Sequence, residues 1–315
     1  MSSAAAPFPK EADESGAFVR QQSAFRDRVS ADGSTDFPAE AGRYHLYVSL
    51  ACPWAHRTII VRKLKGLEEA ISLSIVDPLR DEKGWRFGPD FPDPLEHGWA
   101  YLSEAYHATN PAFDGRVTVP TLWDTKTGRV VNNESADIIV MLNEAFDAFA
   151  TNADLDLYPE DLREEIDELN AWVYDDVNNG VYKAGFAAKQ ASYEAAVRPL
   201  FVALERLDER LSTRRYLFGD EPTLADWRLF TTLVRFDAVY VGHFKCNVQR
   251  IVDFPNLSGY LRDLYQQPGV AETVDFDHIK RHYYMTHGSI NPAGVVPIGP
   301  ELELDAPHGR EHVGG

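Results

Sequence analysis

Apolar and polar side chains follow two different periods around the first cysteine of this chain. Across residues 44–48 apolar and polar positions alternate, which predicts a half-buried strand. Across residues 60–64 apolar positions recur at helical spacing. Pro53 suits the first turn of that helix, where the missing N–H is no loss. We therefore predict a strand, a turn, and a helix that begins at Cys52.

The alternation of strand and helix periods continues through the first half of the chain. It predicts the order β-α-β, an insertion, then β-β-α. Pro120 interrupts the third strand, because a proline cannot donate a hydrogen bond within a sheet. The predicted segments are a strand at 71–76, an ordered aromatic-rich insertion at about 79–114, a strand at 117–123, a hairpin turn at 125–128 into a strand at 130–131, and a helix capped by residues 132–135.

The second half of the chain is predicted to be helical. Apolar stripes at helical spacing run through 162–177, 197–211, 223–241, 257–265 and 271–284, and the first of these ends at Asn178-Asn179-Gly180. Thr223 and Asp226 have the spacing of a capping box. We thus expect four parts: an extended arm at 1–40, an α/β domain at 41–150, an all-helical domain at 158–288, and an irregular tail at 289–315.

Composition and charge exclude several classes of function. The chain has 315 residues and a net charge of −18, which argues against sequence-independent binding to nucleic acid. No apolar run reaches membrane-spanning length and the N-terminus lacks a signal-peptide core, so we expect a cytoplasmic protein that does not bind membranes. The histidines lack the H-E-x-x-H or any other metal-ligand spacing, so we expect no metal site.

Only two cysteines are present, Cys52 and Cys246, which excludes a disulfide framework. At a helix N-terminus, unpaired N–H groups and the helix dipole favour a thiolate, so the pattern favours a reactive Cys52 over a merely buried one. Ala55 stands where a C-x-x-C motif would have its second thiol. If Cys52 is catalytic, it therefore works as a single thiol and needs an external thiol to resolve it. Cys246 is interpreted as structural.

Several motifs together resemble one known family. They are Tyr-Val-Ser-Leu-Ala-Cys-Pro-Trp-Ala-His-Arg, Gly-Trp-Arg-Phe, Val-Pro-Thr, Asn-Glu-Ser, Asn-Asn-Gly-Val-Tyr-Lys-Ala-Gly-Phe-Ala, Thr-Leu-Ala-Asp and Ser-Ile-Asn-Pro-Ala-Gly. In this order they resemble the Xi class of glutathione transferases, the glutathionyl-hydroquinone reductases. The resemblance covers nearly the whole chain after residue 40. It implies a glutathione transferase fold, in which a thioredoxin-like α/β domain precedes an all-α domain.

The resemblance also implies a site. Cys52 would be the catalytic nucleophile and glutathione the co-substrate. A cis Pro120 would face the cysteine and expose the Val119 backbone to the cysteinyl part of glutathione. The remaining implied residues are Glu134 and Ser135 for the γ-glutamyl end, Trp85 beside glutathione, and Tyr182 and Tyr283 for the hydroquinone. Tyr283 is chosen over Tyr284 with little physical basis.

The implied reaction removes glutathione from a glutathionyl-hydroquinone, or a related aromatic conjugate, and the resemblance implies a homodimer. Two kinds of alternative stay open at the level of sequence. One is a different cysteine-type enzyme of the same fold, such as an omega-like thiol transferase, a dehydroascorbate reductase or a deglutathionylase. The other is a non-enzymatic binding module.

Overall fold

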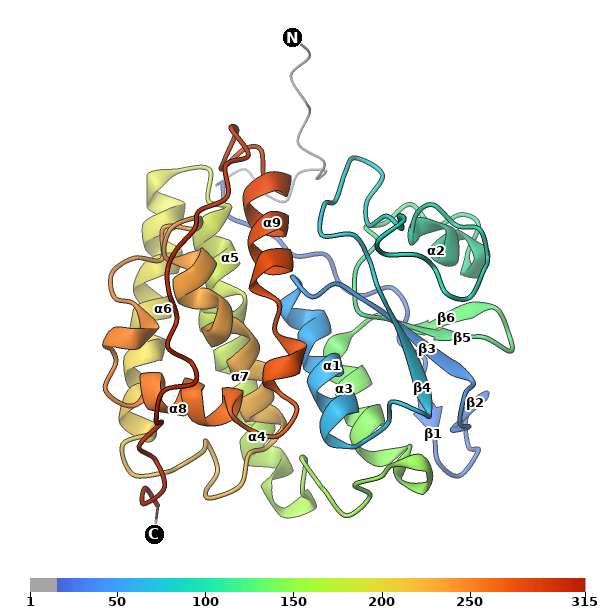
Figure 1. Cartoon of the computed structure of the whole chain (residues 1–315), viewed down its shortest axis with the longest axis horizontal. Helices are drawn as coiled ribbons and strands as arrows, with labels where there is room; N and C mark the ends of the chain where they lie inside the picture. The colour runs from blue at the N-terminus through green and yellow to red at the C-terminus, as the bar shows by residue number, and fades with distance from the viewer. Residues whose placement is uncertain (1–15, 315) are drawn as a thin grey trace. The chain divides into compact units, whose positions relative to one another are not determined.

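The computed structural model describes residues 16–314, and within them the chain forms two compact units (Figure 1). The first unit holds Gln21–Asp156 and Thr273–His282, and the second holds residues 16–20, Leu157–Glu272 and residues 283–314. Residues 1–15 of the predicted arm and Gly315 of the predicted tail lie outside the described residues.

A four-stranded mixed sheet forms the centre of the first unit, in the order β4-β3-β5-β6. β3 pairs in parallel with β4 and antiparallel with β5, and β5 pairs antiparallel with β6. Helices α1 and α3 pack against each other, and α2 contacts β6 (Figure 1). The bounds are β3 Tyr44–Val48, α1 Pro53–Leu64, β4 Ile71–Ile75, α2 Ser103–Thr109, β5 Thr121–Asp124, β6 Arg129–Asn132 and α3 Ser135–Glu144. This sheet confirms the predicted α/β class of the first half.

The prediction that the first strand is half-buried is wrong, because all five residues of β3 are buried. β3 contacts α1, and the insertion covers its Tyr47 side chain, whose ring centroid lies 5.7 Å from that of Phe87 and whose hydroxyl donates to Asp93 at 3.2 Å. His45 tolerates burial because its ring nitrogens pair with Ser72 Oγ at 2.7 Å and Ser74 Oγ at 2.6 Å. Burial lowers the pKa of His45 to about 4, so the ring is neutral at pH 7.

The arm and the insertion are both ordered where the structure describes them. In the arm, β1 (Val29–Ser30) and β2 (Phe37–Pro38) form a short parallel pair. In the insertion, Leu102 and Tyr106 are buried, and the Tyr106 hydroxyl donates to the carbonyl oxygen of Thr118 at 2.9 Å. The aromatic side chains of the insertion thus anchor it to the first unit.

The second unit is built from helices, as the apolar stripes predict. At the start of α7, Asp226 accepts the Thr223 N–H at 2.7 Å, which confirms the capping box. No helix in residues 16–314 is both long and apolar enough to cross a membrane. The bounds of the remaining helices are α4 Arg163–Val173, α5 Gly180–Gly185, α6 Gln190–Arg210, α7 Leu224–Arg235, α8 Leu257–Tyr265 and α9 Phe276–Thr286, with π-helical turns at Tyr174–Asn178 and Phe236–Tyr240 and 3-10 turns at Asp147–Phe149, Glu160–Leu162, Ile251–Asp253 and Ala271–Thr273. The turn Asp147–Phe149 and the part of α9 up to His282 belong to the first unit.

Three predicted boundaries differ from the structure. The third strand begins at Thr121, because the proline before it breaks the ladder. The last helix begins at Phe276 rather than Ala271, because Asp275 accepts the His278 N–H at 2.9 Å and caps it there. The predicted stop at Asn178-Asn179-Gly180 is not a stop, because a π-helical turn leads directly into α5.

Arg310 and Gln266 hold the irregular tail to the helices. Gln266 donates to the carbonyl oxygens of Leu304 and Ala306, each at 2.7 Å. Buried Arg310 donates to the carbonyl oxygens of Leu211 at 2.8 Å and Arg215 at 3.1 Å, at the end of α6 and the turn after it. A Cβ on Gly259 would lie 2.7 Å from the His308 carbonyl oxygen, so glycine is required where the tail crosses α8. The tail thus packs closely without regular structure.

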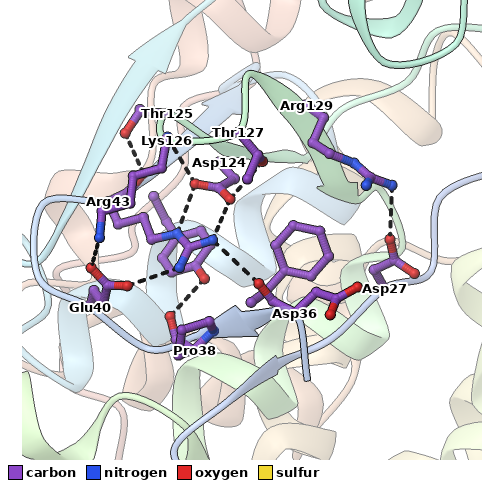
Figure 2. A network of polar contacts seen from close by, with 12 residues as sticks. Asp27, Asp36, Pro38, Glu40, Arg43, Asp124, Thr125, Lys126, Thr127 and Arg129 are labelled. Atoms are coloured by element: carbon purple, nitrogen blue, oxygen red, sulfur yellow. Dashed lines mark hydrogen bonds and ion pairs between the residues drawn. The ribbon is translucent and has the colours of Figure 1, made fainter. Parts of the chain in front are cut away.

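A buried ion pair joins the start of β3 to the end of β5 (Figure 2). Arg43 donates two hydrogen bonds to Asp124, from Nε at 2.9 Å and from Nη2 at 2.6 Å. Its Nη1 donates to Glu40 at 2.9 Å, and the Thr127 hydroxyl donates to Asp124 at 2.7 Å. The Arg43 side chain is 6% exposed and that of Asp124 is 0% exposed. Removing the charge of Asp124 therefore leaves the buried Arg43, among the described residues, with the partly exposed Glu40 as its remaining ion-pair partner.

Asp124→Asn removes the charge but keeps the shape of the side chain. We expect it to lower the free energy of unfolding by about 3 kcal/mol at pH 7, measured by urea denaturation. The matched control is Asp27→Asn, whose ion pair with Arg129 at 3.4 Å is half exposed (Figure 2). The control should lose less than about 1 kcal/mol. Equal losses in both variants would show that the buried ion pair stabilises the fold no more than an exposed one.

The contribution of this ion pair should also depend on pH. Burial raises the pKa of Asp124, but hydrogen bonds from Arg43 and Thr127 outweigh it and hold the pKa below its usual value. The stabilisation is therefore complete above the unfolded carboxyl pKa of about 4 and is lost as the pH falls through the folded-state value. The difference in urea midpoint between parent and Asp124→Asn should narrow between about pH 5 and pH 2. A difference that stays constant would contradict this assignment.

Candidate active site

The Cys52 thiol lies where the chain leaves β3 and begins α1. Cys52 is the N-cap residue, with extended backbone at φ −79° and ψ 117°, and Pro53 occupies the first turn. The Cys52 N–H donates to the Ser49 carbonyl oxygen at 3.1 Å, and the Cys52 carbonyl oxygen accepts the His56 N–H at 2.9 Å. The thiol is half-buried at a helix N-terminus, where a negative charge is favoured.

The loop before β5 faces this cysteine. The Val119–Pro120 peptide bond is cis, as the resemblance predicts, and Cys52 Sγ donates to the Val119 carbonyl oxygen at 3.4 Å. The Thr121 hydroxyl donates to the Thr118 carbonyl oxygen at 2.8 Å, which holds the loop in place. The structure therefore brings together three of the predicted site residues: Cys52, Val119 and Pro120.

Glu134 and Ser135 lie at the N-terminus of α3. Glu134 is the N-cap residue, and its carboxylate accepts the Ala136 N–H at 3.1 Å and the Ser23 hydroxyl at 2.9 Å. Buried Arg57 of α1 donates to the Ser135 hydroxyl at 3.5 Å. This contact ties the start of α3 to the helix that carries Cys52. The helix N-terminus, the hydroxyl and the carboxylate together suit a zwitterionic amino-acid group.

Trp85 is buried in the insertion against His282. The two rings stack with centroids 5.0 Å apart and planes at 21°, and His282 Nδ1 donates to the Pro78 carbonyl oxygen at 2.8 Å. The Arg80 guanidinium carbon lies 5.5 Å from the centroid of Trp85. Burial lowers the pKa of Arg80 to about 10, and the negative charge of Cys52 acts in the opposite direction. Arg80 thus supplies positive charge near the thiol and holds Trp85.

The two predicted tyrosines meet in the second unit. Tyr182 of α5 and Tyr283 of α9 place their hydroxyl oxygens 2.5 Å apart, and the Tyr240 hydroxyl lies 3.1 Å from that of Tyr283. Burial raises the pKa of Tyr283 well above its ordinary value, and the neighbouring tyrosines raise it further. Tyr284 instead packs its ring on His243, with centroids 4.8 Å apart. The hydroxyls of Tyr182, Tyr283 and Tyr240 thus form a series of contacts, which we call the hydroxyl chain. Tyr283 belongs to it and Tyr284 does not.

An aromatic cluster surrounds the hydroxyl chain and keeps it in an apolar setting. The Tyr240 ring stacks on Phe244 with centroids 5.4 Å apart and planes at 7°. The rings of Phe18 and Phe186 contact that of Tyr182, and the ring of His287 contacts that of Tyr283. Such an environment suits a flat aromatic molecule whose polar oxygens face the hydroxyls.

The remaining cysteine and histidines have structural contacts. Cys246 is fully buried, and burial raises the pKa of its thiol, which makes it a poor nucleophile. His56 Nε2 lies 2.7 Å from the Thr273 hydroxyl. Across residues 16–314, no group of three or more histidine, cysteine, aspartate or glutamate side chains could hold a metal ion.

Sequence reasoning missed Arg80, His282 and Tyr240. Arg80 and His282 reach Trp85 through contacts that no sequence motif encodes. Tyr240 lies on the predicted apolar stripe of its helix, so the pattern indicates an ordinary core residue. Its position within a π-helical turn is a structural signal, because such turns frequently accompany functional sites.

Comparisons with known proteins agree with this geometry. Residues 51–145 match the model of the glutathione S-transferase N-terminal domain, and residues 190–263 match that of the C-terminal domain. Glutathionyl-hydroquinone reductase YqjG of Escherichia coli strain K12 is 56% identical over 94% of this chain and 93% of its own length. Glutathionyl-hydroquinone reductase PcpF of Sphingobium chlorophenolicum is 51% identical over 92% and 91%.

Solved structures give the same result. The glutathione-bound structure of YqjG superposes with a TM-score of 0.89 at 55% identity, over 92% of this chain and 96% of that one. The Xi class glutathione transferase of Natrialba magadii superposes with a TM-score of 0.90 at 52% identity, over 92% of each chain. The chain therefore belongs to the Xi class of the glutathione transferase family, together with the glutathionyl-hydroquinone reductases.

Proposed function

We propose that this protein is a glutathionyl-hydroquinone reductase, which removes the glutathionyl group from a hydroquinone with one catalytic cysteine. The observation that carries the proposal is the Cys52 thiol at the N-terminus of α1, with Ala55 where a second thiol would stand. Two relatives above 50% identity bear the name of this activity. Glutathione is accordingly the co-substrate.

The residues of the first unit fit the parts of glutathione. The Val119 backbone would pair with its cysteinyl part, next to the Cys52 thiol. The first N–H groups of α3 and the Ser135 hydroxyl would bind the γ-glutamyl carboxylate, and Glu134 would bind the amino group. Trp85 would pack against the peptide.

The chemistry is a two-step thiol exchange. The Cys52 thiolate attacks the sulfur atom of the conjugate, the sulfur–aryl bond breaks, and a Cys52–glutathione disulfide forms. The electron pair stays on the aryl carbon, which takes up one proton to give the hydroquinone. A second glutathione loses its thiol proton and attacks the mixed disulfide, which releases glutathione disulfide and the Cys52 thiolate. The net proton balance is zero.

The tyrosine hydroxyl chain would serve the aromatic part of the substrate. Each phenol can donate one hydrogen bond, so a Tyr182 hydroxyl that donates to a substrate oxygen must accept from Tyr283, which in turn accepts from Tyr240. Hydrogen bonds in such a series strengthen one another. The hydroxyl chain would stabilise negative charge on a phenolic oxygen of the substrate as the sulfur–aryl bond breaks.

Cys52→Ser should abolish turnover of glutathionyl-menadiol, because a serine hydroxyl cannot form the mixed disulfide. The control is Cys246→Ala, which should retain activity because that thiol is buried and unreactive. Mass spectrometry of the parent after exposure to the substrate should find one glutathionyl group on Cys52. Retained activity in Cys52→Ser would contradict the two-step mechanism.

Tyr182→Phe and Tyr283→Phe each remove one hydroxyl of the chain. We expect kcat/KM for glutathionyl-menadiol to fall about 100-fold in each, because a donor to developing charge is lost. Reduction of hydroxyethyl disulfide should be unaffected, since that substrate has no phenolic oxygen. Tyr284→Phe is the matched control and should resemble the parent. Equal losses on both substrates would contradict the assigned role.

Two measurements separate the alternatives. Glutathionyl-menadiol, dehydroascorbate and hydroxyethyl disulfide assayed side by side distinguish this reductase from a dehydroascorbate reductase or a general deglutathionylase. Titration of the free thiol tests the non-enzymatic alternative, because a binding module needs no shift from the value of about 8.5 for free cysteine. The tyrosine hydroxyl chain favours the aromatic substrate over the others.

We further propose a cytoplasmic homodimer. The resemblance to the Xi class supports the dimer, and two free cysteines fit a reducing compartment. Light scattering of the purified protein would determine its mass in solution.

A further inference from the structure

A short N-terminal segment, Gly16–Arg20, packs onto the aromatic cluster of the second unit. Phe18 is 7% exposed and stacks on Phe186 at 5.6 Å and on Tyr182 at 6.4 Å between ring centroids. The Gly16 carbonyl oxygen accepts the Ala188 N–H at 3.1 Å. The segment is therefore anchored at one end by the backbone and in the middle by an aromatic ring.

Arg20 ends this segment directly over Tyr182. Its guanidinium carbon lies 5.0 Å from the centroid of the Tyr182 ring and 5.3 Å from that of Phe18. Its Nε donates to the Asn179 side-chain oxygen at 2.8 Å. The Asn179 contact thus fixes one edge of the guanidinium while its carbon lies over the Tyr182 ring, which is the geometry of a cation–π contact.

Asn179 connects this contact to the backbone that carries Tyr182. Its carbonyl oxygen accepts the Tyr182 N–H at 3.0 Å, and its side chain accepts from Arg20. The preceding Asn178 donates to the Thr232 hydroxyl at 2.8 Å, which fixes the π-helical turn against α7. The two asparagines of the Asn-Asn-Gly-Val-Tyr motif thus bind different partners: Asn178 binds Thr232 of α7, and Asn179 binds Arg20.

We propose that Arg20 is a positioning residue that holds the Tyr182 ring in the hydroxyl chain and so favours substrates with a phenolic oxygen. This inference rests on the proposed function. A phenol turns about two side-chain bonds, and a cation over its face restricts both. The positive charge also favours electron density that builds up on the Tyr182 oxygen as its proton moves toward the substrate.

The test compares Arg20→Met, Arg20→Lys and the control Arg28→Met. Methionine keeps the apolar stem and removes the charge, whereas lysine keeps a cation that can reach the ring. Arg28 is on the same arm, half exposed, with a long ion pair to Asp137 at 3.9 Å. Steady-state kinetics with glutathionyl-menadiol and with hydroxyethyl disulfide, together with thermal melting, are measured for each variant.

We expect Arg20→Met to lower kcat for glutathionyl-menadiol about tenfold, because Tyr182 is no longer held in its productive position. KM for glutathione and turnover of hydroxyethyl disulfide should stay within about twofold of the parent, because neither needs the phenol. Arg20→Lys should recover most of the loss, and Arg28→Met should resemble the parent.

A double-mutant cycle gives the decisive readout. In a Tyr182→Phe background, Arg20→Met should cause no further loss, because the hydroxyl that it positions is absent. Additive losses, equal losses on both substrates, or an unchanged Arg20→Met would overturn the role of Arg20. If the parent reduces hydroxyethyl disulfide but not glutathionyl-menadiol, the proposed function fails, and this inference fails with it.

Discussion

The N-terminus of α1 is the constraint on which the chemistry of the first unit depends. β3 ends at Val48, and a turn closed by the hydrogen bond from the Cys52 N–H to the Ser49 carbonyl oxygen leads into α1. Pro53 fills the first turn without a donor, and Cys52 takes the cap position. The thiol therefore lies where helix N–H groups favour a negative charge. The Val119 carbonyl and the Arg80 guanidinium then define its surroundings.

Burial of polar groups in the first unit is matched by specific partners. His45 lies between two serines of β4, and Arg43 forms a two-fold contact with Asp124. His282 donates to a backbone carbonyl while its ring supports Trp85. Each of these groups would be costly to bury alone, so each requires one arrangement of the elements around it. The result is a rigid frame for the cysteine.

The second unit achieves a different effect with neutral groups. The hydroxyls of buried Tyr240 and Tyr283 and of partly exposed Tyr182 bond to one another among aromatic rings. An apolar setting strengthens hydrogen bonds, and burial raises the pKa of Tyr283 well above its ordinary value. The first unit thus provides a charged environment for a thiol, and the second holds a neutral series of hydrogen-bonded hydroxyls.

The sequence by itself determined the α/β-then-helical order, the strand and helix around Cys52, and the capping box of α7. These features depend on neighbours within a few residues, so local periodicity and capping residues are enough to predict them. Only the tertiary structure decided which of Tyr283 and Tyr284 joins Tyr182, and it alone brought Tyr240, Arg80, His282 and Arg20 to their partners. Those contacts join residues far apart in the chain. They depend on how side chains of different elements pack together, and such packing leaves no periodic signal in the sequence.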